Sequence, residues 1–210
     1  MEKFKKALKW FFESFIWLGL ILFIIDLVTK LVVVANKEYI VSNGGIVLIP
    51  NFLRINYLIN NNLVFGISFG SDTANRITFC IAAMLIVVGF IIFLVFKWGK
   101  LNKMYRACAM MILSGAFGNL VDRLFYSPEF LANPVNGVVD WIDFYGVWKF
   151  NFNIADSAVV VAAIMLIVFI LVTDIIEYKK TPKPVEEKDD TKVISKTEQE
   201  KNEYLDHKDE

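Results

Sequence analysis

Histidine is almost absent from this chain of 210 residues, since the only one, His207, lies in a charged tail at the C-terminus. A zinc protease of the HExxH type, or a serine or cysteine nucleophile with an imidazole base, needs a histidine near the apolar part of the chain. Those classes are excluded. A serine–lysine pair would have to use Lys30, which has Asp26 beside it and no serine in an obvious relation to it. Only carboxylates remain for hydrolytic chemistry.

The chain also has few cysteines and no net charge. The two cysteines, Cys80 and Cys108, both lie in apolar runs without a metal-ligand spacing, which is typical of small core residues. Lys+Arg and Asp+Glu both total 22, giving a net charge of +0. A neutral chain has no electrostatic footprint for nucleic acid, so we expect no nucleic-acid partner.

Apolar residues are abundant, at 56% of the chain with 15% aromatic, which is more than a soluble domain of this size could bury. A membrane-spanning helix needs about 20 predominantly apolar residues. Four stretches meet that length: 10–34, 77–96, 104–125 and 153–177. The sequence therefore predicts an all-α membrane protein, with a four-helix domain over residues 1–178 and a charged, disordered cytoplasmic tail over 179–210.

Basic residues flanking a span tend to stay in the cytoplasm. They cluster before the first span, between the second and third, and after the fourth: Lys3, Lys5, Lys6, Lys9, Lys97, Lys100, Lys103, Arg106, Lys179, Lys180 and Lys183. Both termini are therefore expected inside the cell, and segments 35–76 and 125–152 outside. An N-terminal signal peptide is not expected, because the first apolar stretch is too long and no small-residue cleavage site follows it.

The first outer segment has the composition of β-structure. Residues 38–48 alternate β-branched and polar side chains around the letters SNGG, which is a hairpin signal, and residues 51–69 are rich in Ile, Tyr, Phe and Val. We therefore predict a small extracytoplasmic β-sheet on the outer leaflet, together with an outer loop.

Ionisable residues within a span cost free energy and need a partner or a function. Asp26 and Lys30 are separated by one helical turn, so they can pair along one face. Two readings stay open: a self-neutralising pair at the helix end, or a pair that positions substrate or a neighbouring helix.

The third and fourth spans carry further polar residues toward the same membrane face. Asn119 and Asp122 lie on one face of the third, where they can reach a neighbouring helix. Asn153 and Asp156 share a face at the start of the fourth, where helix capping is an alternative role. Asp140 and Asp143 lie just upstream of that helix. Asp174, eighteen residues beyond Asp156, belongs to the other end.

Two neighbouring carboxyl groups cannot both ionise easily, so they share a proton; one then activates water as a base while the other acts as an acid toward the carbonyl. This chemistry suffices for peptide-bond hydrolysis. Four candidates could form such a pair, and residue chemistry does not choose between them: Asp122, Asp140, Asp143 and Asp156.

Three motifs resemble those of bacterial lipoprotein signal peptidase, also called signal peptidase II. They are GNLVDR (118–123), GVVDWIDF (137–144) and FNIADS (152–157), in this order on the last two of four spans. The resemblance covers most of residues 10–178, more loosely in the N-terminal half.

The resemblance implies a membrane aspartyl protease of the bacterial cell membrane, with Asp140 and Asp156 as the catalytic pair at the outer face. It implies cleavage of prolipoproteins before a cysteine that bears a diacylglyceryl group, without metal or organic cofactor. Lipid-modified prolipoproteins and membrane lipid are the expected partners of a monomeric enzyme. Residues matching the family's supporting positions are Asn119, Asp122, Arg123, Asn153, Asp26, Lys30 and Asn60.

The chain also departs from the family pattern. Asn62, Leu63 and Val64 stand where the family usually has Gly-Ala-Ala, and Leu27 replaces a glutamine. The spacer from Arg123 to Gly137 is longer than usual, and the charged tail has no counterpart. These differences concern substrate contacts more than the catalytic pair.

Two other functional classes are consistent with intramembrane carboxylates. A small transporter or proton relay would need acidic groups staged through the depth of the bilayer, whereas these candidates gather at one face. A structural assembly protein with capping aspartates would tolerate Asn at every one of these positions.

Overall fold

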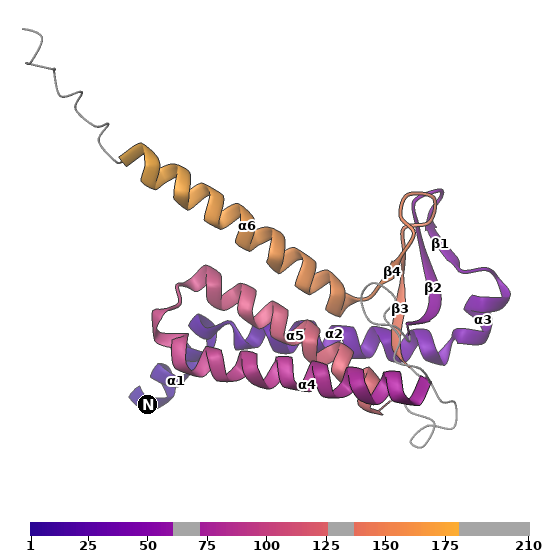
Figure 1. Cartoon of the computed structure of the whole chain (residues 1–210), viewed down its shortest axis with the longest axis horizontal. Helices are drawn as coiled ribbons and strands as arrows, with labels where there is room; N and C mark the ends of the chain where they lie inside the picture. The colour runs from indigo at the N-terminus through magenta and orange to yellow at the C-terminus, as the bar shows by residue number, and fades with distance from the viewer. Residues whose placement is uncertain (61–71, 126–136, 181–210) are drawn as a thin grey trace, which may run out of the picture. The chain divides into compact units, whose positions relative to one another are not determined.

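The computed structural model describes residues 1–60, 72–125 and 137–180. The chain forms two compact units, Met1–Leu171 and Val172–Glu210, and the described part of the second is the C-terminal end of the last helix. The elements, drawn in Figure 1, are α1 (Glu2–Ser14), α2 (Ile16–Ala35), α3 (Lys37–Ser42), β1 (Ile46–Ile49), β2 (Leu53–Asn60), α4 (Asp72–Lys97), η2 (Trp98–Lys100), α5 (Lys103–Phe125), β3 (Val138–Asp143), β4 (Asn151–Phe152) and α6 (Ile154–Lys180).

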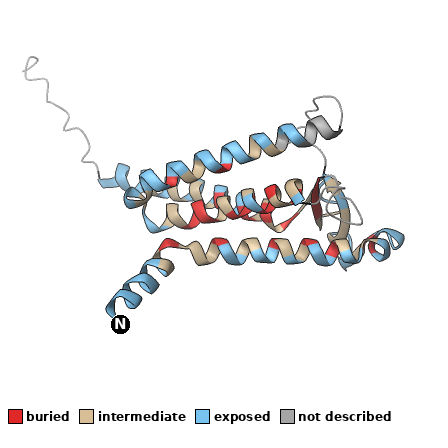
Figure 2. Cartoon of the chain, turned by 90° about the horizontal axis from the view of Figure 1, so that it is seen from below, coloured by how far each residue is buried: buried red, intermediate tan, exposed pale blue. Residues whose placement is uncertain are grey.

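Within the described residues, four helical stretches are long and apolar enough to cross a membrane, as the sequence predicts. They are Ile16–Ala35, Cys80–Lys100, Lys103–Phe125 and Ile154–Lys180. The third has the lowest mean hydropathy, 1.2, and the largest share buried inside the protein, 44% against 17%, 11% and 6% for the others. Because α5 packs against both α2 and α4, its side chains meet protein and can be more polar (Figure 2).

The first span begins later than expected. Residues 10–34 do not form one helix, because Phe15 adopts a left-handed conformation (φ 59°) that separates α1 from α2. The hydroxyl of Ser14 donates to the Phe11 carbonyl (2.8 Å) and accepts the Ile16 N–H (3.3 Å) at this break. The N-terminal lysines therefore belong to α1, and the apolar span is α2 alone.

The predicted outer segments contribute the strands of a four-stranded antiparallel sheet in the order β1-β2-β3-β4. The expected hairpin over 38–48 is wrong in position. Residues 37–42 form α3, and Gly44 and Gly45, at φ 66° and 100°, end this helix, with the Gly45 N–H donating to the Ile40 carbonyl (2.8 Å). Paired glycines with positive φ serve a helix end as readily as a hairpin, and the hairpin itself turns between β1 and β2.

The sheet is attached to α2 through a small apolar core of Val33, Ile40 and Val139. Val139 is on β3, and successive strand residues point to opposite faces. Because Val139 is fixed in this core, its neighbour Asp140 points to the other face, toward α6. The sheet therefore determines where Asp140, one of the four candidate carboxylates, lies.

Candidate active site

The predicted polar residues come together at one end of the helices, from α2, α5, β2, β3 and the start of α6. Five of them are almost completely buried: Asp26, Lys30, Asp122 and Asn153 are each at most 1% exposed, and Asp140 is 2% exposed. Charged groups removed from water to this extent must be paired or hydrogen-bonded. Their contacts therefore define the site.

Lys30 is the cation at the centre of this cluster. Its Nζ lies 2.7 Å from Asp26 Oδ2 and 3.0 Å from Asp122 Oδ2, and it donates to Asn119 Oδ1 at 3.1 Å. The predicted pair along α2 is confirmed, but it is not a self-contained pair at a helix end. Lys30 joins α2 to α5, as the second reading of the sequence proposed.

Asp26 and Asp122 each hold a second element in place. Asp26 Oδ1 accepts the backbone N–H of Ala155 (2.9 Å), one of the donors left free in the first turn of α6. Asp122 Oδ2 accepts the backbone N–H of Val139 (3.1 Å) on β3. These carboxylates position the backbone segments that carry Asp156 and Asp140.

The start of α6 is a reciprocal helix cap. Asn153 Oδ1 accepts the Asp156 N–H (2.9 Å), while Asp156 Oδ2 accepts the Asn153 N–H (3.2 Å). This is the arrangement of a capping box, with Asp in the place of the usual Glu. The capping role considered from the sequence is therefore present, and Asp156 retains a second oxygen for other contacts.

Two asparagines link Asp156 to Asp140. Asn119 Nδ2 donates to Asp156 Oδ1 (2.8 Å), and Asn153 Nδ2 donates to Asp140 Oδ1 (2.8 Å) and to Asn119 Oδ1 (3.1 Å). Asn60 Nδ2, from β2, donates to Asp140 Oδ2 (3.0 Å). Asn153 thus contacts both carboxylates, one through its side chain and the other through its backbone.

Within the described residues, two of the four candidate aspartates contact a cation, and the other two do not. Asp122 is bound to Lys30, and Asp143 accepts Arg54 Nε at 2.6 Å and Asn56 Nδ2 at 3.4 Å. Across the described ranges, no ion pair joins Asp140 or Asp156 to a cation. These two carboxylates are held by amides instead.

Burial, and to a smaller extent the neighbouring charge of Asp156, raises the pKa of Asp140 to about 7. The amides of Asn60 and Asn153 oppose this shift only in part, because they stabilise the ionised form. Near neutral pH, Asp140 therefore exists in both protonated and ionised forms, as a group that transfers protons must.

Arg123 makes a different contact from the other predicted supporting residues. Its Nη1 donates to the Asn119 carbonyl (3.2 Å), and its own carbonyl accepts Cys80 Sγ (3.5 Å). No ion pair links it to a carboxylate in the described part of the chain. The altered loop positions Asn62, Leu63 and Val64 lie outside the described residues, as does the tail from residue 181 on.

Sequence reasoning missed the partner of Asp143. Arg54 and Asp143 are directly opposite on β2 and β3, so they form a cross-strand pair of opposite charge. The alternating pattern of each strand was visible in the sequence, but their register was not. The contact from Asp26 to the first turn of α6 was also missed, since 129 residues separate its two members.

No group of three or more His, Cys, Asp or Glu side chains in the described residues is arranged to hold a metal ion. The polar contacts of this site run instead between carboxylates, asparagine amides and one lysine. Such a set can hold, donate and accept a proton within hydrogen-bonding distance.

Comparisons with known proteins agree with this arrangement. Residues 18–172 match the family model described as Signal peptidase (SPase) II. A lipoprotein signal peptidase of Desulfitobacterium hafniense is 34% identical over 160 residues, which are 76% of this chain and 94% of that one. Another from Clostridium novyi is 37% identical over 151 residues, covering 70% and 90%.

Solved structures give the same result. One described as a bacterial membrane enzyme has 26% sequence identity and a TM-score of 0.56, covering 81% of this chain and 93% of its own. A second with the same description has 27% identity and a TM-score of 0.54. The match of sequence, helices and sheet over most of the chain leads to one conclusion: this protein belongs to the signal peptidase II family of membrane proteases.

Proposed function

We propose that Asp140 and Asp156 are the catalytic pair with which this aspartic peptidase removes signal peptides from diacylglyceryl-modified prolipoproteins. Membership of the family makes the protein a peptidase of lipoprotein precursors. The proposal assigns that reaction to two residues and gives each a role. Cleavage occurs before the lipidated cysteine of the precursor.

One observation carries the assignment. Asp122 and Asp143 are each neutralised by a cation, whereas Asp140 and Asp156 are both held by Asn153 and have no ion pair in the described residues. A cation bound to a carboxylate favours its ionised form and makes it a poorer proton donor than the same group without a cation. Two adjacent carboxylates without a cation share a proton, which is the state that acid–base hydrolysis requires.

The surroundings support a division of roles. Asp156 lies in the first turn of α6, at the positive end of the helix dipole, and its two oxygens accept N–H donors of Asn119 and Asn153. Asp140, with its pKa raised to about 7, can hold a proton near neutral pH. Asp156 accepts a proton from the attacking water while Asp140 donates one to the peptide carbonyl oxygen, and the departing amine then takes a proton from the pair.

The remaining polar residues act through position. Asn119 and Asn153 orient the two carboxylates, and Asn60 contacts Asp140 from β2. Lys30, Asp26 and Asp122 fix the helix and strand that carry the pair. All of these groups come from one chain, which supports activity as a monomer in a lipid bilayer.

The distribution of basic residues supports an orientation with both termini in the cytoplasm of a bacterial cell and the site at the outer face of the membrane. A lipidated precursor would then present its diacylglyceryl group to the outer leaflet and its signal peptide to the bilayer. A transporter or proton relay is disfavoured because the candidate carboxylates gather at one end.

Asp140→Asn and Asp156→Asn test the assignment. Each variant should lower kcat for a lipidated precursor peptide by about 10²–10⁴-fold, since each removes one partner of the proton transfer. Cleavage is measured in detergent on protein whose folding is verified by its thermal unfolding. A normal rate in either folded variant would refute the pair.

Asp143→Asn is the matched control. It removes a carboxylate three residues from Asp140 that is paired with Arg54. This change should lower thermal stability and leave kcat of the folded protein within about threefold, because the amide contacts of Asp140 and Asp156 are untouched. Proton flux without precursor cleavage in liposomes would instead favour the transport hypothesis.

A further inference from the structure

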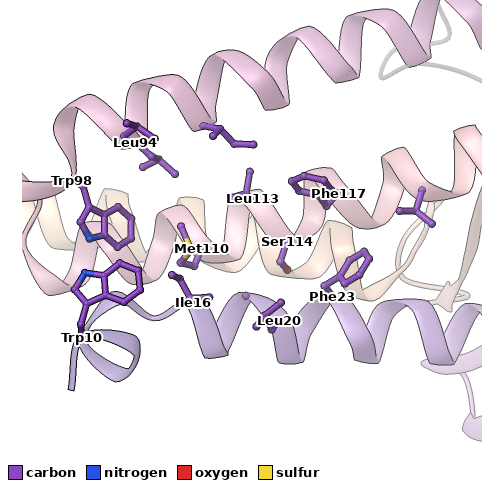
Figure 3. Close-up of a pocket in the computed structure, with 14 residues that line it drawn as sticks. Trp10, Ile16, Leu20, Phe23, Leu94, Trp98, Met110, Leu113, Ser114 and Phe117 are labelled. Carbon is purple, nitrogen blue, oxygen red and sulfur yellow. The ribbon is translucent and has the colours of Figure 1, made fainter. Parts of the chain in front are cut away.

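An apolar groove lies between α2, α4 and α5, away from the carboxylate pair. Its volume is about 710 Å³, and its walls include Leu20 and Phe23 of α2, Leu94 of α4, and Leu113 and Phe117 of α5. Figure 3 shows these side chains facing a common space between the helices. Pockets for small organic ligands typically measure about 300–1,000 Å³. The groove is therefore large enough for one extended apolar chain.

The depth of the groove matches one leaflet of a membrane. Along α5 its walls extend from Met110 to Val121, which is about 16 Å at about 1.5 Å per residue. The hydrocarbon core is about 30 Å thick, and a spanning helix needs about 20 residues. The groove covers about half of that thickness, so it suits an acyl chain of one leaflet better than a spanning peptide helix.

One end of the groove is marked by aromatic and basic residues. Trp10 of α1 and Trp98 of η2 line it together (Figure 3), and tryptophan is enriched where hydrocarbon meets head groups. Arg106 stacks on the Trp98 ring, 5.4 Å from its centroid, and its Nη2 donates to the Trp98 carbonyl (3.2 Å). The Trp98 Nε1 and Arg106 Nε donors are buried without an acceptor in the described residues.

Charge at this end is predominantly positive. Residues 97–106 contain four basic residues and no acidic one. α1, which packs against α2 and α5, adds four lysines and two glutamates. Basic residues beside a membrane attract anionic lipid head groups. An apolar groove of one-leaflet depth that ends in tryptophans and cations is complementary to a single class of ligand.

We propose that this groove binds one anionic phospholipid of the leaflet opposite the carboxylate pair. One acyl chain lies between α2, α4 and α5, and the phosphate faces Lys97, Lys100 and Arg106. With the orientation inferred above, this is the cytoplasmic leaflet. The site holds a structural lipid and is separate from the site of precursor cleavage.

Native mass spectrometry of the full-length protein, extracted from nanodiscs of phosphatidylglycerol or phosphatidylcholine, measures the retained lipid. One phosphatidylglycerol per chain should remain, at least about tenfold more than phosphatidylcholine. Lys97→Gln with Lys100→Gln should lower this retention about tenfold, because two cations near the phosphate are lost. The same substitutions at Lys179 and Lys180 are the matched control and should leave it unchanged.

The second claim of the proposal, that an acyl chain lies in the groove, is tested by filling the groove with a bulky side chain. Leu20→Trp places an indole in it, whereas Ile21→Trp on the same helix adds the same bulk at an exposed position outside its walls. The first variant should lower retention at least about fivefold and the second should not. Peptidase activity in detergent should persist in both, which separates failure of this proposal from failure of the catalytic one.

Equal retention of the two lipids, or equal retention by Leu20→Trp and Ile21→Trp, would overturn the proposal. Stoichiometric displacement of the bound lipid by a lipidated precursor would also overturn it, because the groove would then belong to the path of the signal peptide. Persistence of the lipid in the presence of saturating precursor is the expected result.

Discussion

At the scale of single residues, asparagine does what neither aspartate nor lysine could do. Its amide has a donor and an acceptor end, so Asn119 accepts from Lys30 at Oδ1 and donates to Asp156 from Nδ2. Asn153 likewise accepts the Asp156 N–H and donates to Asp140. The proposed catalytic pair is held by groups that orient the carboxylates without fixing a full positive charge beside them.

The raised pKa of Asp140 predicts a pH-dependent effect on stability. With a folded-state pKa near 7 and an ordinary value of 3.8, ionising Asp140 in the folded protein destabilises it as pH rises between these values. Asp140→Asn removes that loss. The free energy of unfolding of the Asp140→Asn variant minus that of wild type should therefore be about 1–3 kcal/mol larger at pH 8 than at pH 5.

Chemical unfolding of both proteins in detergent at the two pH values measures this difference. Each protein serves as its own reference, so a constant effect of the substitution on packing cancels. A gap of the same size at pH 5 and pH 8 would contradict a raised pKa at Asp140.

At the scale of elements, Lys30 connects α2 to α5 and neutralises two buried carboxylates. Lys30→Met leaves Asp26 and Asp122 without a cation, each 1% exposed. We expect a loss of about 3–5 kcal/mol in the free energy of unfolding, because uncompensated buried charges are costly. Lys103→Met, which removes an exposed lysine at the start of α5, should change it by less than about 0.5 kcal/mol.

Chemical unfolding in detergent at neutral pH compares the two variants. A Lys30→Met protein as stable as Lys103→Met would mean that the cluster around Lys30 contributes nothing to helix association. Asp122→Asn in the Lys30→Met background should restore part of the loss, since it removes one of the two unpaired charges.

Glycine on α5 allows the elements of the site to approach closely. A Cβ added at Gly118 would collide with Asp26 Oδ2 and lie 3.2 Å from the Ala155 Cβ, so Gly118→Ala must move α5 away from its neighbours. We expect a loss of about 1–3 kcal/mol and reduced cleavage. Gly89→Ala on α4 meets nothing within 4 Å and is the matched control.

Thermal unfolding and precursor cleavage are measured for both glycine variants. The Gly89 variant should match wild type in both assays. If Gly118→Ala is equally well tolerated, the close approach of α5 to Asp26 is not needed for the site.

At the scale of the whole molecule, the proposed orientation makes a prediction about access from outside the cell. After replacement of Cys80 and Cys108 by Ala, a single cysteine at Lys149, near the sheet, should react with a membrane-impermeant maleimide on intact cells. A single cysteine at Lys100, at the other end of the spans, should react only after permeabilisation. Both residues are exposed in the described structure.

Labelling is detected by the mass shift of the purified protein. Reaction at Lys100 in intact cells, with none at Lys149, would reverse the proposed orientation. The positive-inside pattern would then need another explanation, because eleven basic residues flank the spans on that side.

The sequence by itself determined the four spans, the presence of a sheet and the gathering of polar groups at one end. These follow from hydropathy, strand alternation and helical spacing, which are local properties. It also limited the chemistry to carboxylates through the lack of histidine, and its motifs indicated the family. Local signals misplaced the hairpin, because two glycines end a helix as well as they turn a strand.

Only the tertiary structure decided which aspartates are paired with cations. The register of β2 and β3 brings Arg54 to Asp143, and the packing of α2 on α5 brings Lys30 to Asp122. Both contacts join residues more than 85 positions apart. Charge neutralisation depends on distance in space, which residue chemistry alone does not specify. The motifs pointed to Asp140 and Asp156 by resemblance, and the fold gave a physical reason by placing a cation beside each of the other two candidates.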